Sequence, residues 1–325
     1  AVPYILLGWL LAVAACYALG AMLLARLAVA WSREETVALR FVMGAGLYSF
    51  VVFLLGIGHL YYRGVFIGLP MLLLAGAWRM GVLALPAERL PELPYFWRKM
   101  LWLGAPFLVL YFANALAPEA SPDGASYHLG LVAKYYREHA MVPVTTNLYA
   151  ALSQGMEMLF LAAYAVGRHS AAALVHFTYL LALPWLLICY GRRYGMPGAG
   201  VTAAGLVFLS PVVGIDGISA YNDVAAASVW TVLLLVLRRM EEMPGARGLW
   251  VMAGVLGGCA YGMKYTLFPA LLLAGVWVLW LHRRASLRPL VTIGVAAAPF
   301  IAPWVIRNTL WWQNPLAPFF NNWFP

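Results

Sequence analysis

Long, uninterrupted apolar runs are the feature that most constrains this chain. They cover residues 4–30, 41–60, 100–117, 171–190, 221–237 and 265–281. The hydrocarbon core of a bilayer needs about 20 helical residues, and continuous apolar runs differ from the alternating pattern of a membrane barrel. Only 10% of the residues are charged, whereas soluble domains carry about 25%. The sequence therefore predicts an all-α polytopic membrane protein.

The placement of the basic residues predicts how the chain is threaded. We expect about 10 transmembrane helices, with the N-terminus on the outer side. This threading puts 15 of the 21 Lys and Arg residues in inner loops and 6 outside, as the positive-inside rule requires. The net charge of +9 therefore reflects span ends, and we expect no nucleic-acid partner because the basic residues form no groove or stripe.

The chain divides into two predicted regions. Residues 1–98 form an N-terminal three-helix membrane segment with a cytoplasmic loop, and residues 99–325 form a transmembrane core. A helical outer loop, 118–169, follows the fourth helix, and loops of this length are uncommon unless functional. Its segment 153–167 is apolar but short and contains Glu157, so we expect an interfacial or re-entrant helix there. The chain stops just after an apolar run, which suggests a truncated C-terminus.

Asp123 is the strongest candidate for chemistry. It follows an outgoing helix, between a proline and a glycine. Inserting an ionisable side chain at membrane depth costs roughly 2.5–3.5 kcal/mol, so its presence there suggests that it serves a function. Its other explanation is that it caps the next helix. Tyr127, His128, Lys134 and Arg137 follow on one short helix, where aromatic faces suit sugar rings and cations suit phosphate.

Three further positions lie on predicted outer turns. Asn222 and Asp223 open a helix, where capping is the simpler explanation, but Asp223 could also orient a hydroxyl or help to hold a cation. Lys264 interrupts the apolar stretch 249–281; it either reaches the lipid head groups or binds a phosphate. Arg307 closes the last helix. A phosphate about 4 Å from such a cation gains on the order of 4 kcal/mol at an effective dielectric near 20.

Nucleotide-driven chemistry is not indicated. The sequence has no phosphate-cradling Gly-rich loop and no serine nucleophile elbow. The histidines lack a shared metal-ligand spacing, so we assign no zinc site. A lone histidine such as His128 is more often structural than catalytic.

Four short strings resemble the GT-C fold glycosyltransferases. They are DGASYHL at 123–129, AYND at 220–223, GMKYT at 262–266 and RNTLWWQNPLAPFF at 307–320. Within that superfamily the chain is most similar to the bacterial group of protein O-mannosyltransferases, the lipid A aminoarabinose transferase and RgtA/B/C/D-like domains. Several relatives have a second acid directly after the first-loop Asp, where this chain has Gly124.

The resemblance implies an inverting transfer of a sugar from a polyprenyl-phosphate donor to a hydroxyl of a glycan, lipid or protein acceptor. Asp123 would be the general base. The resemblance and the cluster together assign substrate binding to Tyr127, His128, Lys134, Arg137, Glu157, Asp223, Lys264, Tyr265 and Arg307. The resemblance leaves metal dependence open: Asp123 and Asp223 could hold a divalent cation, Mg or Mn. The expected location is the bacterial cytoplasmic (inner) membrane, with membrane lipids as neighbours and the site on the periplasmic side.

Two other functions compete with this one. The chain could be a non-catalytic GT-C-like subunit that scaffolds a larger complex with other membrane subunits. A transporter or flippase is disfavoured. Such a protein is expected to show paired repeats and charges near mid-membrane, whereas the charges of this chain lie at the ends of the predicted spans. The enzyme hypothesis predicts that Asp123, Lys264 and Arg307 converge on one outward pocket.

Overall fold

The protein is an all-helical bundle, as predicted. The computed structural model describes residues 2–282 and 287–324, and the described part contains no β-strand. Its elements are α1 (Val2–Leu27), α2 (Arg33–Ile57), α3 (Arg63–Arg79), α4 (Tyr95–Met100), η1 (Leu101–Gly104), α5 (Ala105–Ala115), η2 (Gly124–His128), α6 (Leu129–Arg137), η3 (Leu148–Ala151), α7 (Gly155–Arg193), α8 (Pro197–Phe208), α9 (Pro211–Ile218), α10 (Asp223–Glu242), α11 (Arg247–Met263), η4 (Tyr265–Leu267), α12 (Phe268–His282) and α13 (Arg288–Trp312).

Five stretches of helix are long and apolar enough to cross a membrane. They are α1, α2, α7, α13 and the segment Tyr265–His282, and the bent pair α8–α9 makes a sixth if it is one span. By contrast, α3 and α11 have 17 residues each, which is about 26 Å of helix against the roughly 30 Å of a hydrocarbon core. A helical membrane protein is therefore supported, whereas about 10 spans stays a prediction.

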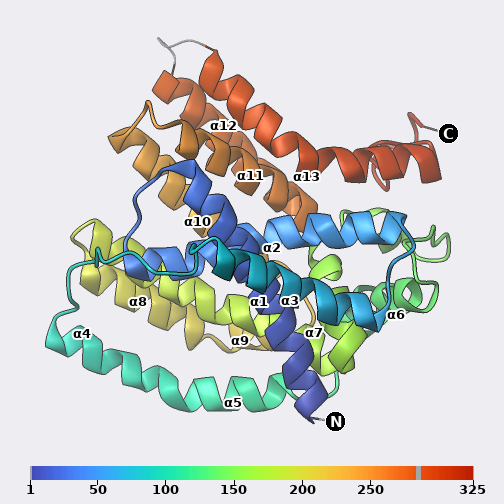
Figure 1. Ribbon diagram of the computed structural model, residues 1–325, viewed down its shortest axis with the longest axis horizontal. Helices are drawn as coiled ribbons and strands as arrows, with labels where there is room; N and C mark the ends of the chain where they lie inside the picture. The colour runs from blue at the N-terminus through green and yellow to red at the C-terminus, as the bar shows by residue number, and fades with distance from the viewer. Residues whose placement is uncertain (1, 283–286, 325) are drawn as a thin grey trace.

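Helix α7 lies at the centre of the bundle and packs against α1, α2 and α10 (Figure 1). Beside it, α1 and α2 cross with their backbones almost in contact. A Cβ at Gly20 would overlap the carbonyl of Arg40, and one at Gly44 would overlap the carbonyl of Cys16. Small residues allow such close approach of two helices. The three cysteines, Cys16, Cys189 and Cys259, are buried and form no disulfide.

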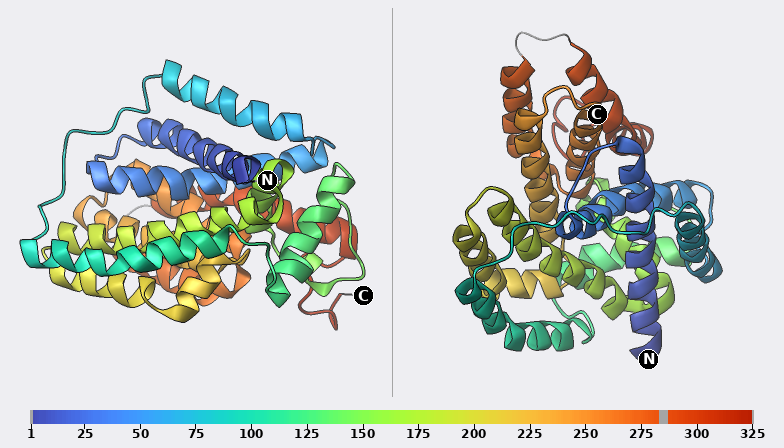
Figure 2. Two further views of the ribbon diagram at one scale, coloured as in Figure 1. Left: turned by 90° about the horizontal axis from the view of Figure 1, so that it is seen from below. Right: turned by 60° about the vertical axis from the view of Figure 1, so that its left-hand side comes forward.

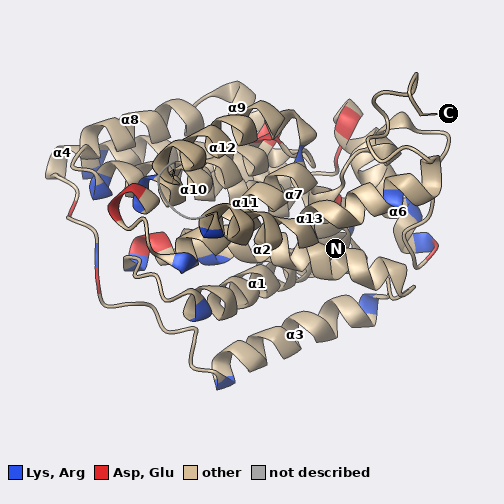
Figure 3. Ribbon diagram, turned by 90° about the horizontal axis from the view of Figure 1, so that it is seen from above, with Lys and Arg blue, Asp and Glu red and all other residues tan. Residues whose placement is uncertain are grey.

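The predicted inner loops gather at one end of the bundle, here called the arginine-rich end. Arg192 pairs with Glu34 at 3.1 Å, and Arg193 pairs with Glu35. Arg40 donates to the carbonyls of residues 83 and 84, and Arg239 to that of residue 30. Figure 3 shows basic and acidic residues gathered on the side of the molecule where α4 and α8 lie. The grouping of these loops is confirmed, whereas their cytoplasmic location stays a prediction. Arg283 and Arg284, two more of the basic residues that the predicted threading places inside, lie outside the described residues.

The predicted outer segments meet at the opposite end, here called the Asp123 end. Arg63 lies over the ring of Tyr4, at 4.8 Å from the ring centre. Ser170 donates to the carbonyl of Ala117 at 3.0 Å, and Ser153 to that of Tyr261 at 2.8 Å. The loop 118–169 is helical over much of its length, as expected.

Segment 153–167 forms the first part of α7. The helix bends sharply at Arg168 (φ 64°, ψ −151°). The rings of Phe160 and His176 lie 6.5 Å apart, whereas 16 residues of straight helix would span about 24 Å. The segment starts beside Gly262 and ends beside Tyr4, both at the Asp123 end. It therefore does not run from one end of the bundle to the other. Residues 155–167 are buried among the other helices, and the choice between an interfacial and a re-entrant helix stays a prediction.

Two further helices differ from the prediction. The stretch 198–214, which the predicted threading counts as one outgoing helix, is broken into α8 and α9, which meet at 66°. The break falls at Ser210 because the following proline disfavours the helical conformation of the residue before it. The last helix continues to Trp312, so Arg307 lies inside α13 and does not close it.

Candidate functional site

Asp123 presents an exposed carboxylate at the Asp123 end, where it accepts a hydrogen bond from the hydroxyl of Tyr127. It lies directly before the π-helical turn η2 and makes no capping hydrogen bond. Ser121 takes that part instead, because its Oγ accepts from the N–H of Gly124 at 3.2 Å. The explanation of Asp123 as a helix cap is therefore wrong, and its carboxylate is available to a ligand.

Glu119 fixes the turn that carries Asp123. Its carboxylate accepts from the N–H of Ser121 at 2.9 Å and from the N–H of Ala220 at 2.6 Å. A Cβ on Gly124 would come within 2.7 Å of the Glu119 carboxyl carbon, so a larger residue does not fit there without a shift. Glu119 thus joins the outer loop to the turn before α10, a contact that the sequence analysis missed.

Tyr127 forms an aromatic stack beside Asp123. Its ring lies 4.1 Å from that of Tyr149 and nearly parallel to it, and 4.3 Å from the ring of His128. Burial raises the pKa of the Tyr127 hydroxyl, and the negative charge of Asp123 raises this pKa further. The hydroxyl therefore remains protonated and can donate a hydrogen bond. Aromatic faces with a polar edge are suited to binding a sugar ring.

His128 and Glu157 form a buried pair. The Nδ1 of His128 lies 2.6 Å from Oε1 of Glu157, and the two residues are 3% and 4% exposed. Within the described residues the His128 Nε2 has no hydrogen-bond partner, and the buried Oε2 of Glu157 has none either. A carboxylate on one ring nitrogen fixes the orientation of an imidazole and leaves the other nitrogen for a ligand.

The turn before α10 is arranged differently from the prediction. Asp216 accepts from the N–H of Val224 at 3.1 Å and so caps α10, whereas Asn222 makes no capping bond and donates to the carbonyl of Met263 at 3.1 Å. Asp223 pairs with Lys264. The capping explanation for Asn222 is therefore wrong. Lys264 is held by a carboxylate at the tip between α11 and α12, and its side chain is 23% exposed.

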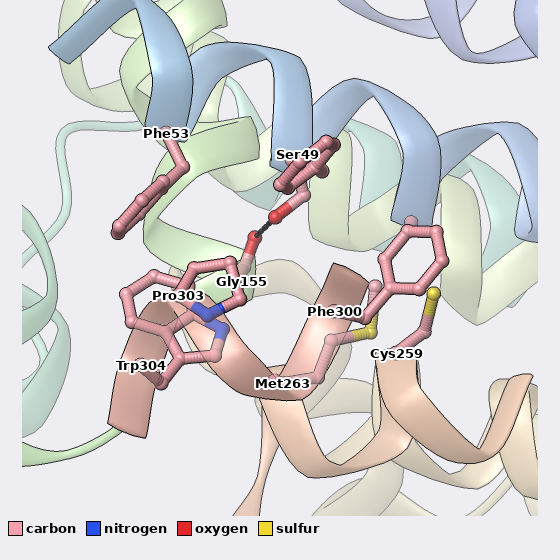
Figure 4. A pocket seen from close by; sticks show the side chains of 11 residues that line it. Ser49, Phe53, Gly155, Cys259, Met263, Phe300, Pro303 and Trp304 are labelled. Carbon is pink, nitrogen blue, oxygen red and sulfur yellow. Dashed lines mark hydrogen bonds between the residues drawn. The ribbon is translucent and has the colours of Figure 1, made fainter. Parts of the chain in front are cut away.

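Arg307 is buried and bound to the loop that carries Tyr149. Its Nη2 donates to the carbonyls of Ala151 and Leu152 at 3.0 and 2.8 Å. Its guanidinium also lies over the ring of Trp304. Trp304 lines a small cavity between α2 and α13, beside the hydrogen bond from Ser49 to Gly155 (Figure 4). In the described part of the chain, neither Arg307 nor Lys264 contacts Asp123, so the predicted convergence of these three residues on one pocket is not observed.

The remaining predicted residues lie apart from Asp123. Lys134 is 11 positions further along the chain, a separation of roughly 16 Å in a helix, and Arg137 is exposed at the end of α6. That end of α6 leads into His139, whose carbonyl accepts from the N–H of Tyr61. Tyr265 packs on the ring of Phe319.

Among residues 2–282 and 287–324, no three His, Cys, Asp or Glu side chains are close enough to hold a metal ion. The metal requirement stays a prediction.

Comparison with known proteins identifies a family. A family model described as "Domain of unknown function (DUF8201)" matches residues 3–322. The chain belongs to the DUF8201 family. The DUF8201 match covers both the N-terminal three-helix segment and the Asp123 end, so both are parts of the family's domain. No curated protein and no solved structure matches the chain.

Proposed function

We propose that this DUF8201 protein is an inverting glycosyltransferase that takes its sugar from a polyprenyl-phosphate donor. One observation carries the proposal: Asp123 offers an exposed carboxylate that makes no helix-capping hydrogen bond, beside an aromatic stack and an oriented imidazole. The apolar helices favour a donor that is itself dissolved in the membrane. The resemblance of four sequence strings to GT-C glycosyltransferases supports the same reaction class.

Asp123 would act as the general base. The acceptor hydroxyl oxygen attacks the anomeric carbon, and its proton moves to the Asp123 carboxylate. The bond from the anomeric carbon to the phosphate oxygen breaks, and its electron pair stays on the phosphate. The carboxylate would contribute through its position beside the acceptor hydroxyl, and such catalysis typically adds about 10²–10⁴-fold.

The surrounding side chains would bind the donor. Tyr127 and Tyr149 offer stacked faces for the sugar, and Nε2 of His128 is free to bond to a sugar hydroxyl. Lys264 would bind the phosphate by exchanging part of its contact with Asp223, which is 60% exposed. Arg307 would act indirectly, by holding the loop that carries Tyr149. The site would face the periplasm.

The test is sugar transfer by the full chain in proteoliposomes, with undecaprenyl phosphate carrying a radiolabelled hexose or pentose as donor and a bacterial lipid extract as acceptor. Asp123→Asn should lower transfer at least about 10²-fold. Glu138→Gln removes an exposed carboxylate at the end of α6 and should leave transfer unchanged. Transfer retained by Asp123→Asn, with the protein folded, would show that Asp123 is not the base.

A non-catalytic membrane subunit is the second candidate. It is favoured by the observation that Lys264 and Arg307 both have internal partners, so each has a structural role without any substrate. This alternative predicts no transfer by the wild-type chain from either donor. It also predicts recovery of other membrane subunits when the protein is purified in a mild detergent.

A further inference from the structure

A long apolar groove runs along the edge of the bundle, away from Asp123. The helices α4, η1 and α5 form a rod beside α7 and α8 (Figure 2). Between them lies a groove of about 970 Å³, lined by residues such as Trp102, Leu108, Trp185 and Leu206. Trp102 and Leu206 are 75% and 72% exposed. This volume is near the upper end of the range of about 300–1,000 Å³ for small-molecule sites.

Two cations without a carboxylate partner mark one end of this groove. Arg98 lines it, and Lys99 follows in α4. In the described part of the chain, neither side chain forms an ion pair, and both lie over the ring of Tyr95, at 5.8 and 4.4 Å from its centre. The nearby Arg192, which also bonds to the carbonyl of Pro91, is by contrast paired with Glu34. The groove therefore offers an apolar channel with an unneutralised positive end.

Gly205 leaves the groove open at its centre. It lies inside α8, it lines the groove, and a Cβ built on it would meet no atom within 4 Å. Glycine is disfavoured in the middle of a helix, so the helix itself gives no reason for it. The absence of a side chain keeps the space free.

We infer that this groove binds an anionic phospholipid, with an acyl chain along α8 and the phosphate at Arg98 and Lys99. An amphipathic anion complements both features. Its acyl chain covers the apolar walls of the groove, and its phosphate neutralises the two cations, Arg98 and Lys99. A lipid here would fasten the rod α4–η1–α5 to α8. This inference needs only a membrane environment and is independent of the proposed glycosyl transfer.

Native mass spectrometry of the full chain, released from detergent with added lipid, tests the site. The probes are phosphatidylglycerol and phosphatidylcholine with identical acyl chains. Wild-type protein should bind phosphatidylglycerol at least about 10-fold more tightly. Arg98→Gln combined with Lys99→Gln should remove this preference, and Gly205→Leu should weaken binding of both lipids, because its side chain fills the groove.

Matched controls come from elsewhere in the chain. Gly294→Leu also adds a side chain where no atom lies within 4 Å, but on α13, and Arg79→Gln removes an exposed cation at the end of α3. Both should bind lipid as the wild type does. Equal binding of the two lipids by the wild type, or equal behaviour of Gly205→Leu and Gly294→Leu, would overturn the inference. So would tight binding of undecaprenyl phosphate that Gly205→Leu weakens and that phosphatidylglycerol cannot displace, since the groove would then hold a polyprenyl phosphate.

Discussion

Glu157 and His128 depend on each other because both lie inside the bundle. Removal of the carboxylate in Glu157→Ala leaves the Nδ1 of a buried imidazole without a partner, and an unsatisfied buried group costs about 1–3 kcal/mol. The expected result is a loss of that size in the free energy of unfolding, measured by denaturant titration in detergent. Glu157→Gln, which keeps an acceptor, should lose less. Glu138→Ala removes an exposed carboxylate and is the control. If Glu157→Ala were no less stable than Glu138→Ala, the pair of His128 and Glu157 would not contribute to stability.

Arg307 is tied to its loop by a planar, forked group that lysine cannot imitate. Arg307→Lys should therefore lower the free energy of unfolding by about 1–3 kcal/mol, since a carbonyl of the loop 148–152 loses its donor. The same loop should become more sensitive to limited proteolysis. Arg137→Lys, on the exposed end of α6, is the matched control and should change stability by less than about 0.5 kcal/mol. Equal stability of the two variants would contradict this assignment.

Single residues were predictable where their local context was decisive. The carboxylate of Asp123, between a proline and a glycine after an outgoing helix, is exposed and uncapped. The partners of Glu119, Glu157 and Lys264 were not predictable, because they lie 101, 29 and 41 positions away along the chain. Neither periodicity nor spacing contains information about such pairings. Burial of Arg307 was missed for the same reason, since its partners come from a loop 155–156 positions earlier.

At the scale of elements, the crossing of α1 and α2 should tolerate no side chain at its two contact glycines, Gly20 and Gly44. Gly44→Ala would drive a Cβ into the carbonyl of Cys16, so we expect separation of the helices and a loss of at least about 2 kcal/mol in the free energy of unfolding. Gly68→Ala, in α3, meets open space and should be neutral or stabilising by up to about 1 kcal/mol. Thermal unfolding of both variants in one detergent measures the difference. Similar melting temperatures would mean that the close crossing does not exist in solution.

Helices were easier to predict than their bends. Apolar runs indicate α1, α2 and the segment Tyr265–His282 because a long apolar helix needs no partner to define it. The break between α8 and α9 has a local signal in Pro211, although the sequence analysis did not use it. The bend of α7 has none, since it occurs at an arginine with a positive φ. That conformation is rare outside glycine and is maintained by surrounding structure. Here the Arg168 guanidinium lies over the rings of Tyr136 and Tyr164.

At the scale of the whole molecule, the two ends of the bundle predict an orientation in the membrane. The arginine-rich end should face the cytoplasm, as the positive-inside rule requires, and the Asp123 end should face outward. Cysteine labelling is well suited to this test, because Cys16, Cys189 and Cys259 are buried and should give little background. Ser126→Cys and Ala87→Cys place exposed thiols at the two ends.

A membrane-impermeant maleimide added to intact bacterial cells with a permeabilised outer membrane should label Ser126→Cys. It should label Ala87→Cys only after the inner membrane is opened. The two labelled ends must lie on opposite sides of the membrane if the bundle crosses it. Helix α1 connects these ends, and its 26 residues reach about 39 Å. The reverse labelling would place Asp123 in the cytoplasm, where a periplasmic lipid-linked donor could not reach it. Labelling of both positions from outside would mean that the bundle does not cross the membrane between them.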